Sequence, residues 1–192
     1  MERSFNFQKF ATYPYSFNGN SNAEIVAYLK RKGIYRLYHF TDRRNLDSIL
    51  KEGLFSWSYL DRNSKFYVSG GDNWSHQADE LRGLQNYVRL SFCDDHPMAW
   101  RLHNDGHRLV LIEIDVNVLL NSSVKFSDMN ATKSYSSIGQ GLDFVRNNIN
   151  LSATQQHYVS RNSPLFDAHQ SEVLIDTHIS QRYILDWNHI SF

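Results

Sequence analysis

Disulfide chemistry is almost excluded by the composition of this chain, because its 192 residues include a single cysteine, Cys93. One thiol cannot form an internal disulfide framework, which favours a protein of the reducing cytoplasm. Long apolar runs are also missing, and the first residues lack the basic and apolar segments of a signal peptide. We therefore expect a cytoplasmic protein without a membrane-spanning segment.

An excess of charge of either sign is absent, since 20 lysines and arginines balance 20 aspartates and glutamates. Net charge gives no general attraction to nucleic acid, so any nucleic-acid site must be a local basic patch. No glycine-rich loop follows a predicted strand, which argues against a Rossmann or P-loop nucleotide site. Acidic residues and histidines gather at residues 94–107, but their spacing matches no established metal site, and we expect no bound metal.

Hydrophobic residues (41%) and aromatic residues (14%) are sufficient for one domain with a substantial core. Short predicted strands and short helices follow one another without regular alternation. This indicates an α+β fold with a mixed or antiparallel sheet flanked by short helices. Residues 55–80 and 150–169 have little periodicity and are expected to be irregular. We expect residues 1–36 to form an arm and a helix that pack on a main domain of residues 37–192. The predicted strands are residues 37–40, 87–93, 109–115, 124–127, 172–175 and 183–185.

Residues 38–54 combine a strand, a helix start and basic side chains. Thr41 or Asp42 can cap the helix, because either side-chain oxygen accepts a hydrogen bond from a free amide of the first turn. Arg43 and Arg44 follow in that turn, where positive charge opposes the helix dipole. A phosphate group bound at the helix start would explain the two arginines.

Four segments carry a further signal through their joint order. They are Tyr38-His39-Phe40-Thr41 with Asn45-Leu46, Tyr87–Cys93 with Pro97-Met98, Phe126–Ala131, and Gln170–Ile175. Together they resemble the DarT family of toxins from toxin–antitoxin systems, which transfer ADP-ribose from NAD+ to bases of single-stranded DNA. The resemblance covers residues from about 37 to about 185. It implies a single-domain ADP-ribosyltransferase fold, NAD+ as co-substrate, a cognate antitoxin as partner, and a monomer when free.

The resemblance implies that Glu172, in the family's Gln-x-Glu position, is the catalytic glutamate. Cleavage of the nicotinamide–ribose bond has an oxocarbenium-like transition state, which a carboxylate near the ribose stabilises. Gln170 precedes Glu172 by two residues, so on a strand both side chains would share a face and Gln170 would contact the acceptor base. The alternative for Glu172 is a solvent-facing glutamate at a strand edge, and the alternative for Gln170 is a polar loop residue.

An NAD+ site around His39 is also implied by the resemblance. A neutral imidazole can donate one hydrogen bond and accept another, which suits ribose hydroxyls and helps to place the nicotinamide. Phe40 and Thr41 would offer backbone groups to the carboxamide. For His39 the alternative is a core histidine whose ring is satisfied by the backbone.

Three further polar residues are predicted to lie around NAD+ by the same resemblance. Asn45 and Ser48 would complete the adenosine side of the site, although a purely structural role in the turn is at least as compatible with their positions. Ser91 would support Glu172 from the middle of a strand, or be a buried hydroxyl.

An active-site arginine is also expected from the resemblance. Arg82 has the better context, shortly before the predicted strand 87–93, and Arg62 is the alternative. A guanidinium is always charged and binds a pyrophosphate through paired hydrogen bonds, so we expect Arg82 to bind rather than to accept a proton.

The acceptor base needs a surface that combines aromatic stacking with positive charge. Tyr158, Arg161 and Phe166 lie in the loop before Glu172, where the family positions its substrate. For the two aromatic residues the alternative is a small core under the loop. Arg43, Arg44 and Lys133 would add positive charge.

Two other functions stay open on the sequence alone. The same chemistry on an RNA base, as in a phage-defence toxin, differs in the 2′-hydroxyl, which no residue here is shown to read. A different class is an inactive module that binds NAD+ or nucleic acid without chemistry. The presence of His39, Gln170 and Glu172 together favours an enzyme.

Overall fold

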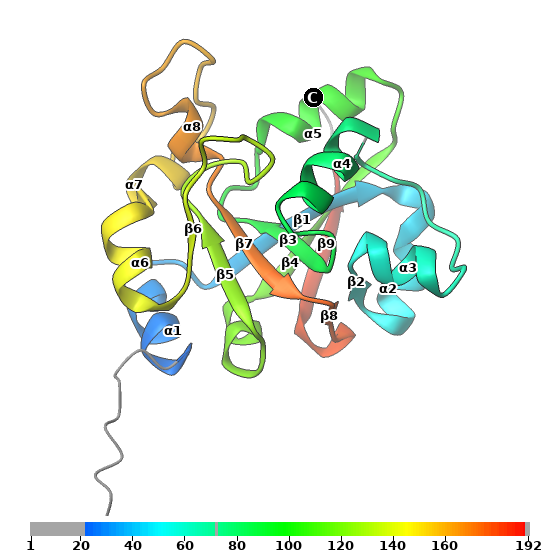
Figure 1. The fold of residues 1–192 in the computed structure, drawn as a ribbon, viewed down its shortest axis with the longest axis horizontal. Helices are drawn as coiled ribbons and strands as arrows, with labels where there is room; N and C mark the ends of the chain where they lie inside the picture. Colours follow the sequence, from blue (N-terminus) through cyan, green and yellow to red (C-terminus); the bar gives the residue numbers. More distant parts are fainter. Residues whose placement is uncertain (1–21, 72, 191–192) are drawn as a thin grey trace, which may run out of the picture.

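One antiparallel sheet of seven strands forms the centre of the structure (Figure 1). The computed structural model describes residues 22–71 and 73–190, so the arm expected at residues 1–21 lies outside the described residues. Every strand pairing among the described residues is antiparallel, which confirms the α+β prediction in its antiparallel form. The strands lie in the order β6 (Ile138–Gly139), β5 (Val124–Ser127), β7 (Glu172–Asp176), β3 (Tyr87–Ser91), β1 (Arg36–Asp42), β4 (Leu109–Asp115) and β9 (Ile184–His189).

Strand β4 follows directly from its sequence. Val110, Ile112 and Ile114 are fully buried, and their branched side chains pack well on a pleated surface. Its partner β1 pairs with it along the whole length from Arg36 to Asp42. This strand is longer than the predicted residues 37–40, because its polar last residues continue the ladder without adding to the apolar pattern.

Helices cover the two sides of the sheet (Figure 1). On one side α1 packs Ile25, Val26 and Leu29 into the same core as the strands, and α6 and α7 lie next to it. No helix within residues 22–71 and 73–190 has the length and apolar character needed to cross a membrane. The helices are α1 (Asn22–Arg31), α2 (Leu46–Glu52), α3 (Trp57–Arg62), α4 (Asn73–Leu81), α5 (Pro97–Asn104), α6 (Gly141–Asn148), α7 (Leu151–Thr154) and α8 (Phe166–His169), with short 3-10 turns η1 (Arg43–Asn45), η2 (Val116–Asn121) and η3 (Gln181–Tyr183).

The segments 55–80 and 150–169 are more regular than the sequence predicts. The first contains α3 and all but the last residue of the nine-residue α4, and the second contains the short helices α7 and α8. Helices of four to six residues are too short to show a helical period in the sequence, and α3 depends on a cap. The side chain of Ser56 accepts a hydrogen bond from the backbone N–H of Tyr59 and so fixes the start of α3.

The connection from β1 into α2 has the predicted capping. Asp42 accepts a hydrogen bond from the backbone N–H of Arg44 at 3.0 Å. Gly53 ends α2 with a φ of +90°, and a Cβ there would lie 2.2 Å from the carbonyl oxygen of Ile179. Glycine is therefore required at this position, where α2 meets the small sheet of β2 (Leu54–Phe55) and β8 (His178–Ile179).

Candidate active site

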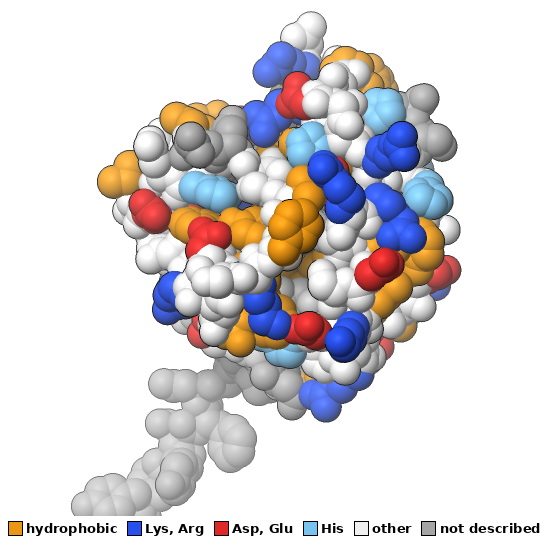
Figure 2. Space-filling model, turned by 90° about the vertical axis from the view of Figure 1, so that its right-hand side faces the viewer, with side chains coloured by type: hydrophobic (Ala, Val, Ile, Leu, Met, Phe, Trp, Pro, Cys, Tyr) orange, Lys and Arg blue, Asp and Glu red, His pale blue; other side chains and the backbone are white. Residues whose placement is uncertain are grey.

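A cavity of about 430 Å³ lies between β1, β3, α2, α3 and α4, a size suited to a small-molecule ligand. Glu172, at the start of β7, reaches the same cavity from the neighbouring strand. Figure 2 shows the face that lies on the right in Figure 1, where basic and hydrophobic side chains are interspersed with acidic ones. All of the predicted NAD+ contacts line this cavity: His39, Phe40, Thr41, Asn45, Ser48 and Ser91.

Glu172 is placed by the pairing of β7 with β3. Its Cα partner across the ladder is Ser91, so the two side chains share a face of the sheet. Arg89, two residues before Ser91, lies on that same face as a diagonal neighbour. Its Nη1 donates a hydrogen bond to Oε2 of Glu172 at 3.1 Å.

A second donor completes the surroundings of Glu172, which is only 6% exposed. The backbone N–H of Ala131 donates to the same Oε2 at 2.7 Å. Burial raises the pKa of Glu172 above its ordinary value, whereas Arg89 and the Ala131 N–H lower this pKa and the charge of Asp79 raises it. The site therefore holds a desolvated carboxylate whose charge is supported by two donors, which suits stabilisation of a developing cation.

Arg89 and Asp79 are site residues that the sequence analysis missed. The guanidinium of Arg89 also contacts the buried carboxylate of Asp79 on α4, which in turn accepts a hydrogen bond from Nε1 of Trp57 at 3.2 Å. A usable signal was present, because Val88 and Leu90 are apolar and alternate with Arg89. A positively charged side chain on the polar face of a short strand is expected to pair with a carboxylate on the neighbouring strand.

His39 contributes a defined hydrogen-bonding ring to the cavity. Its Nδ1 lies 3.0 Å from the carbonyl oxygen of Arg89. Because a carbonyl only accepts, Nδ1 carries the proton and Nε2 is left as an acceptor. Burial lowers the pKa of His39, which keeps the ring neutral near pH 7. Both of its sequence interpretations are compatible with this geometry, since the ring is satisfied by the backbone and also lines the cavity.

Asn45 fastens the wall of the cavity to the helix start. Its Oδ1 accepts from the backbone N–H of Val68 at 2.7 Å, and its Nδ2 donates to the carbonyl of Val68 and to Oγ1 of Thr41. Ser48 donates to the carbonyl of Asn45, and Ser91 donates to the carbonyl of Cys93. These hydroxyl and amide groups are therefore engaged in internal support, and the hydroxyl of Ser91 is hydrogen-bonded to Cys93 rather than to Glu172.

Arg82 does not line the cavity, contrary to the expected position of an active-site arginine. Its guanidinium instead donates to backbone and side-chain oxygens of the loop from Ala131 to Ser136. Arg62 is also outside and contacts Ser58 and Asn86. The arginine beside Glu172 is Arg89.

The predicted acceptor residues lie outside the cavity. Gln170 caps the end of α8 in a helical conformation and donates to the carbonyl of Phe166, so it does not share a strand face with Glu172. The strand begins two residues later than that prediction requires. Tyr158 is 87% exposed, Arg161 is also exposed, and Phe166 is partly buried at the start of α8.

The two arginines at the helix start are committed to neighbouring carboxylates. Arg44 binds Asp42 through two hydrogen bonds at 2.8 and 2.9 Å, and Arg43 pairs with Asp47 at 3.3 Å. Neither lines the cavity, so the expected phosphate site at this helix start is wrong. Carboxylate partners, rather than a ligand, explain the charge in this turn.

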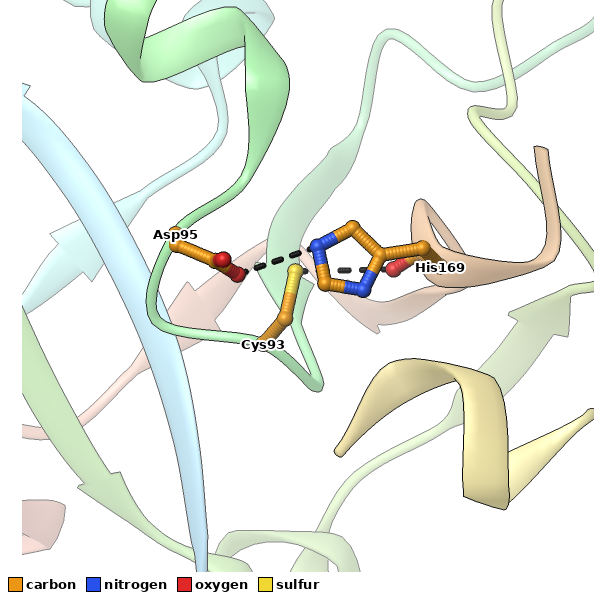
Figure 3. A group of neighbouring side chains, drawn as sticks. All are labelled: Cys93, Asp95 and His169. Carbon is orange, nitrogen blue, oxygen red and sulfur yellow. Dashed lines mark hydrogen bonds and ion pairs between the residues drawn. The ribbon is translucent and has the colours of Figure 1, made fainter. Parts of the chain in front are cut away.

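Cys93, Asp95 and His169 meet beside the loop that precedes Glu172 (Figure 3). Nε2 of His169 lies 3.0 Å from Oδ1 of Asp95, and Nδ1 lies 3.0 Å from the carbonyl of Ala153. Burial opposes charge on the ring, but the Asp95 carboxylate raises the pKa of His169 to about 10. The ion pair between His169 and Asp95 ties α8 to the turn after β3.

Two other histidines of residues 94–107 have separate partners. His96 accepts a hydrogen bond from the backbone N–H of Met98 at 3.2 Å and starts α5. His107 lies 3.1 Å from the carboxylate of Asp42. His96 thus serves a helix start, and His107 belongs to the surroundings of Asp42.

Several solved structures have the same fold as this chain. Thermosipho africanus DarTG in complex with ADP-ribose superposes with a TM-score of 0.71 at 20% identity, covering 82% of this chain and 44% of that one. Thermus sp. 2.9 DarT in complex with ADP-ribosylated ssDNA gives 0.65 at 17% identity, covering 83% of each chain. The same Thermus protein in complex with NAD+ gives 0.63 at 16% identity, covering 82% of this chain and 83% of that one.

Comparison of the sequence with family models assigns the chain to a family, whereas these distant structures show its fold. No curated protein matches it significantly. Residues 38–186, which include most of β1, all of β3 and β7, and every cavity residue discussed above, match the family described as ssDNA thymidine ADP-ribosyltransferase, DarT. The chain belongs to the DarT family.

Proposed function

We propose that this protein transfers ADP-ribose from NAD+ to a thymidine base of single-stranded DNA and releases nicotinamide and a proton. The observation that carries the proposal is the buried Glu172 carboxylate, held by Arg89 and the Ala131 N–H at the wall of a cavity of about 430 Å³. Membership of a family of ssDNA thymidine ADP-ribosyltransferases supplies the reaction class.

Glu172 has the electrostatic role in this reaction. As the bond between nicotinamide and ribose breaks, positive charge develops on the ribose, and a nearby carboxylate stabilises it. Burial makes this interaction stronger than it would be in water, because the surrounding dielectric is low. The nucleophilic atom of the base then bonds to the ribose carbon and loses its proton, which balances the reaction.

Arg89 and His39 are assigned supporting roles. Arg89 keeps Glu172 ionised and oriented through the 3.1 Å hydrogen bond. The acceptor nitrogen Nε2 of His39 is suited to a ribose hydroxyl, because Nδ1–H is occupied by the backbone. Phe40, Thr41, Asn45, Ser48 and Ser91 complete the proposed NAD+ site as lining and support.

The acceptor strand is proposed to approach over the loop before Glu172. Tyr158 and Arg161 are exposed there and are free to stack on a base and to meet a phosphate, whereas Gln170 and Phe166 support α8. Thymidine in DNA is favoured over RNA by the family match, and nothing in the described residues favours RNA. An inactive binding module is disfavoured because the carboxylate and its two donors are assembled.

A cognate antitoxin and a cytoplasmic location are further proposals. The chain spans 44% of the Thermosipho DarTG chain, so other activities and partners of that longer protein are not carried over directly. The 37–192 part is proposed as the catalytic domain, and α1 packs on its core.

Labelled NAD+ and short oligonucleotides test the function directly. The purified protein is incubated with NAD+ and with thymidine-containing DNA, thymidine-free DNA, or RNA of matched sequence. We expect label to appear only on DNA that contains thymidine, with one nicotinamide released for each transfer. Transfer to RNA alone, or nicotinamide release without any modified nucleic acid, would contradict the proposal. Glu172→Gln is the inactive reference.

A further inference from the structure

Two residues at the end of α4 hold the two hydrogen-bond donors of Glu172. We propose that Asp79 and Arg82 are positioning residues that together fix the Glu172 carboxylate and balance the charge around it. The hydrogen bonds of Glu172 come from Arg89 and the Ala131 N–H, so each positioning residue acts through one of these donors. The inference rests on the proposed function only in taking Glu172 as the catalytic group.

Asp79 acts through Arg89. Its buried carboxylate contacts Nη2 of Arg89, while Nη1 of the same guanidinium donates to Glu172. The indole N–H of Trp57 donates to the other oxygen of Asp79 and keeps the carboxylate in place. One guanidinium is thus shared between two carboxylates, so Asp79 orients Arg89 and also competes for its charge.

Arg82 acts through Ala131. Its guanidinium donates to the carbonyl of Ala131 at 3.0 Å, to Oγ and the carbonyl of Ser136 at 2.8 and 2.9 Å, and to the carbonyl of Lys133. One side chain therefore ties both ends of the loop together. The N–H of the same Ala131 is the 2.7 Å donor to Glu172, so its direction depends on how this loop is held.

The charged groups that face Glu172 can be named from each neighbouring element. Arg89 comes from β3 and Asp79 from α4. His39 from β1 and His96 before α5 line the same cavity, and burial lowers the pKa of both, to about 3 for His96. Burial therefore favours the neutral form of both rings.

The two positioning residues should then have opposite effects on one measurable quantity. Removing the charge of Asp79 removes a repulsion and leaves Arg89 to Glu172 alone, which lowers the pKa of Glu172. Releasing the loop by changing Arg82 weakens the Ala131 hydrogen bond, which raises this pKa. A residue that only contributed to folding would give no such opposition.

Titration of the glutamate side-chain carboxyls by carbon-13 NMR tests the inference. The full chain has six glutamates, and loss of one signal in Glu172→Gln assigns the signal of Glu172. We expect Asp79→Asn to lower the pKa of Glu172 and Arg82→Gln to raise it. Arg62→Gln is the matched control, because Arg62 is an exposed arginine bound to Ser58 and Asn86, and it should leave this pKa unchanged.

Shifts in the same direction for both variants, or no shift in either, would overturn the inference. The titration needs no turnover, so a wild-type protein that transfers nothing would refute the proposed function without affecting this test. If transfer is observed, the acid limb of its pH profile should move to lower pH in Asp79→Asn and to higher pH in Arg82→Gln. Arg82→Lys keeps a cation with fewer hydrogen-bond donors, so it should raise the pKa of Glu172 less than Arg82→Gln does.

A folding failure of Arg82→Gln, seen by circular dichroism, would not end the test. Ser136→Ala removes one acceptor of Arg82 and leaves the arginine in place. It should raise the pKa of Glu172 in the same direction by a smaller amount. An unchanged pKa in a folded Ser136→Ala, together with an unchanged pKa in Asp79→Asn, would refute both branches.

Discussion

Nη1 of Arg89 donates to Oε2 of Glu172 over 3.1 Å, although the two residues are 83 positions apart in the chain. The pairing of β3 with β7 brings them together, and the common face of the two strands points them into one cavity. The ion pair keeps a buried carboxylate charged in a place where water cannot do so. A proposed catalytic group is thus built into the centre of the sheet rather than onto a surface loop.

Glu172→Gln should abolish transfer while leaving the fold intact. The amide has nearly the same shape but carries no charge to stabilise the ribose cation, so we expect a loss of at least about a hundredfold in rate. The measurement is single-turnover transfer from labelled NAD+ to thymidine-containing DNA. Glu113→Gln is the matched control. Glu113 forms an ion pair with Arg36 at 2.8 Å, and neither residue lines the cavity. A Glu172→Gln variant with normal turnover would disprove the catalytic assignment.

Arg89→Met should leave two buried carboxylates without their cation. Breaking a buried ion pair by removing one partner typically lowers the free energy of unfolding by about 3–5 kcal/mol. Urea denaturation of the wild type and the variant measures this loss. The pKa of Glu172 should rise further above its ordinary value, so transfer should fall more than in the wild type as the pH decreases, and should recover in part as the pH increases. Arg36→Met, which removes the half-exposed partner of Glu113, should cost less than about 1 kcal/mol. Equal costs for the two variants would contradict this view of the site.

Asn45→Ala should loosen the wall of the cavity formed by Val68 and its neighbours. The change removes two hydrogen bonds to the backbone of Val68 and leaves its N–H and carbonyl to find new partners, for about 1–3 kcal/mol. We expect a higher KM for NAD+ with a smaller change in kcat, because the wall and not the carboxylate is disturbed. Asn63→Ala, which removes an exposed hydrogen bond to Tyr59, should change neither value.

Asp42→Asn should lower stability in a way that depends on pH. The hydrogen bond from Arg44 lowers the pKa of Asp42 from 3.8 to about 2, so its contribution is present above pH 4 and is lost as the pH falls through the folded pKa. The contribution is at most about 2 kcal/mol, because Arg44 is largely exposed and the pair is screened. Urea denaturation should give a difference between wild type and variant at pH 6 that is roughly halved at pH 3. A difference that stays constant with pH would contradict this role.

The local elements were readable in the sequence where one rule dominates. Branched apolar residues predicted β4, and an oxygen-bearing side chain predicted the cap at Asp42, which starts the 3-10 turn η1 that leads into α2. The joint order of four short segments predicted the family and, through it, the fold that the structure shows. Short helices such as α3 and α8 were missed, because four to six residues carry no visible period.

The partners of charged residues could not be read in the same way. Arg82 and Arg89 are both arginines near the same strand, yet one holds a loop and the other meets Glu172. Arg44 was expected to bind phosphate and instead binds Asp42, two positions earlier. Long side chains reach several possible partners, and only the packed structure selects among them.

By itself the sequence determined which residue types are present, where β1, β3, β4, β5 and β7 lie to within a few residues, and that Glu172 and His39 belong to one family pattern. The tertiary structure decided that β3 and β7 are neighbours in a fixed register, which sets Arg89 beside Glu172. It also decided that α4 lies where Asp79 and Arg82 reach the two donors of that carboxylate. The physical reason is that strand and loop propensities are local, whereas the register of distant strands depends on the burial of the whole core.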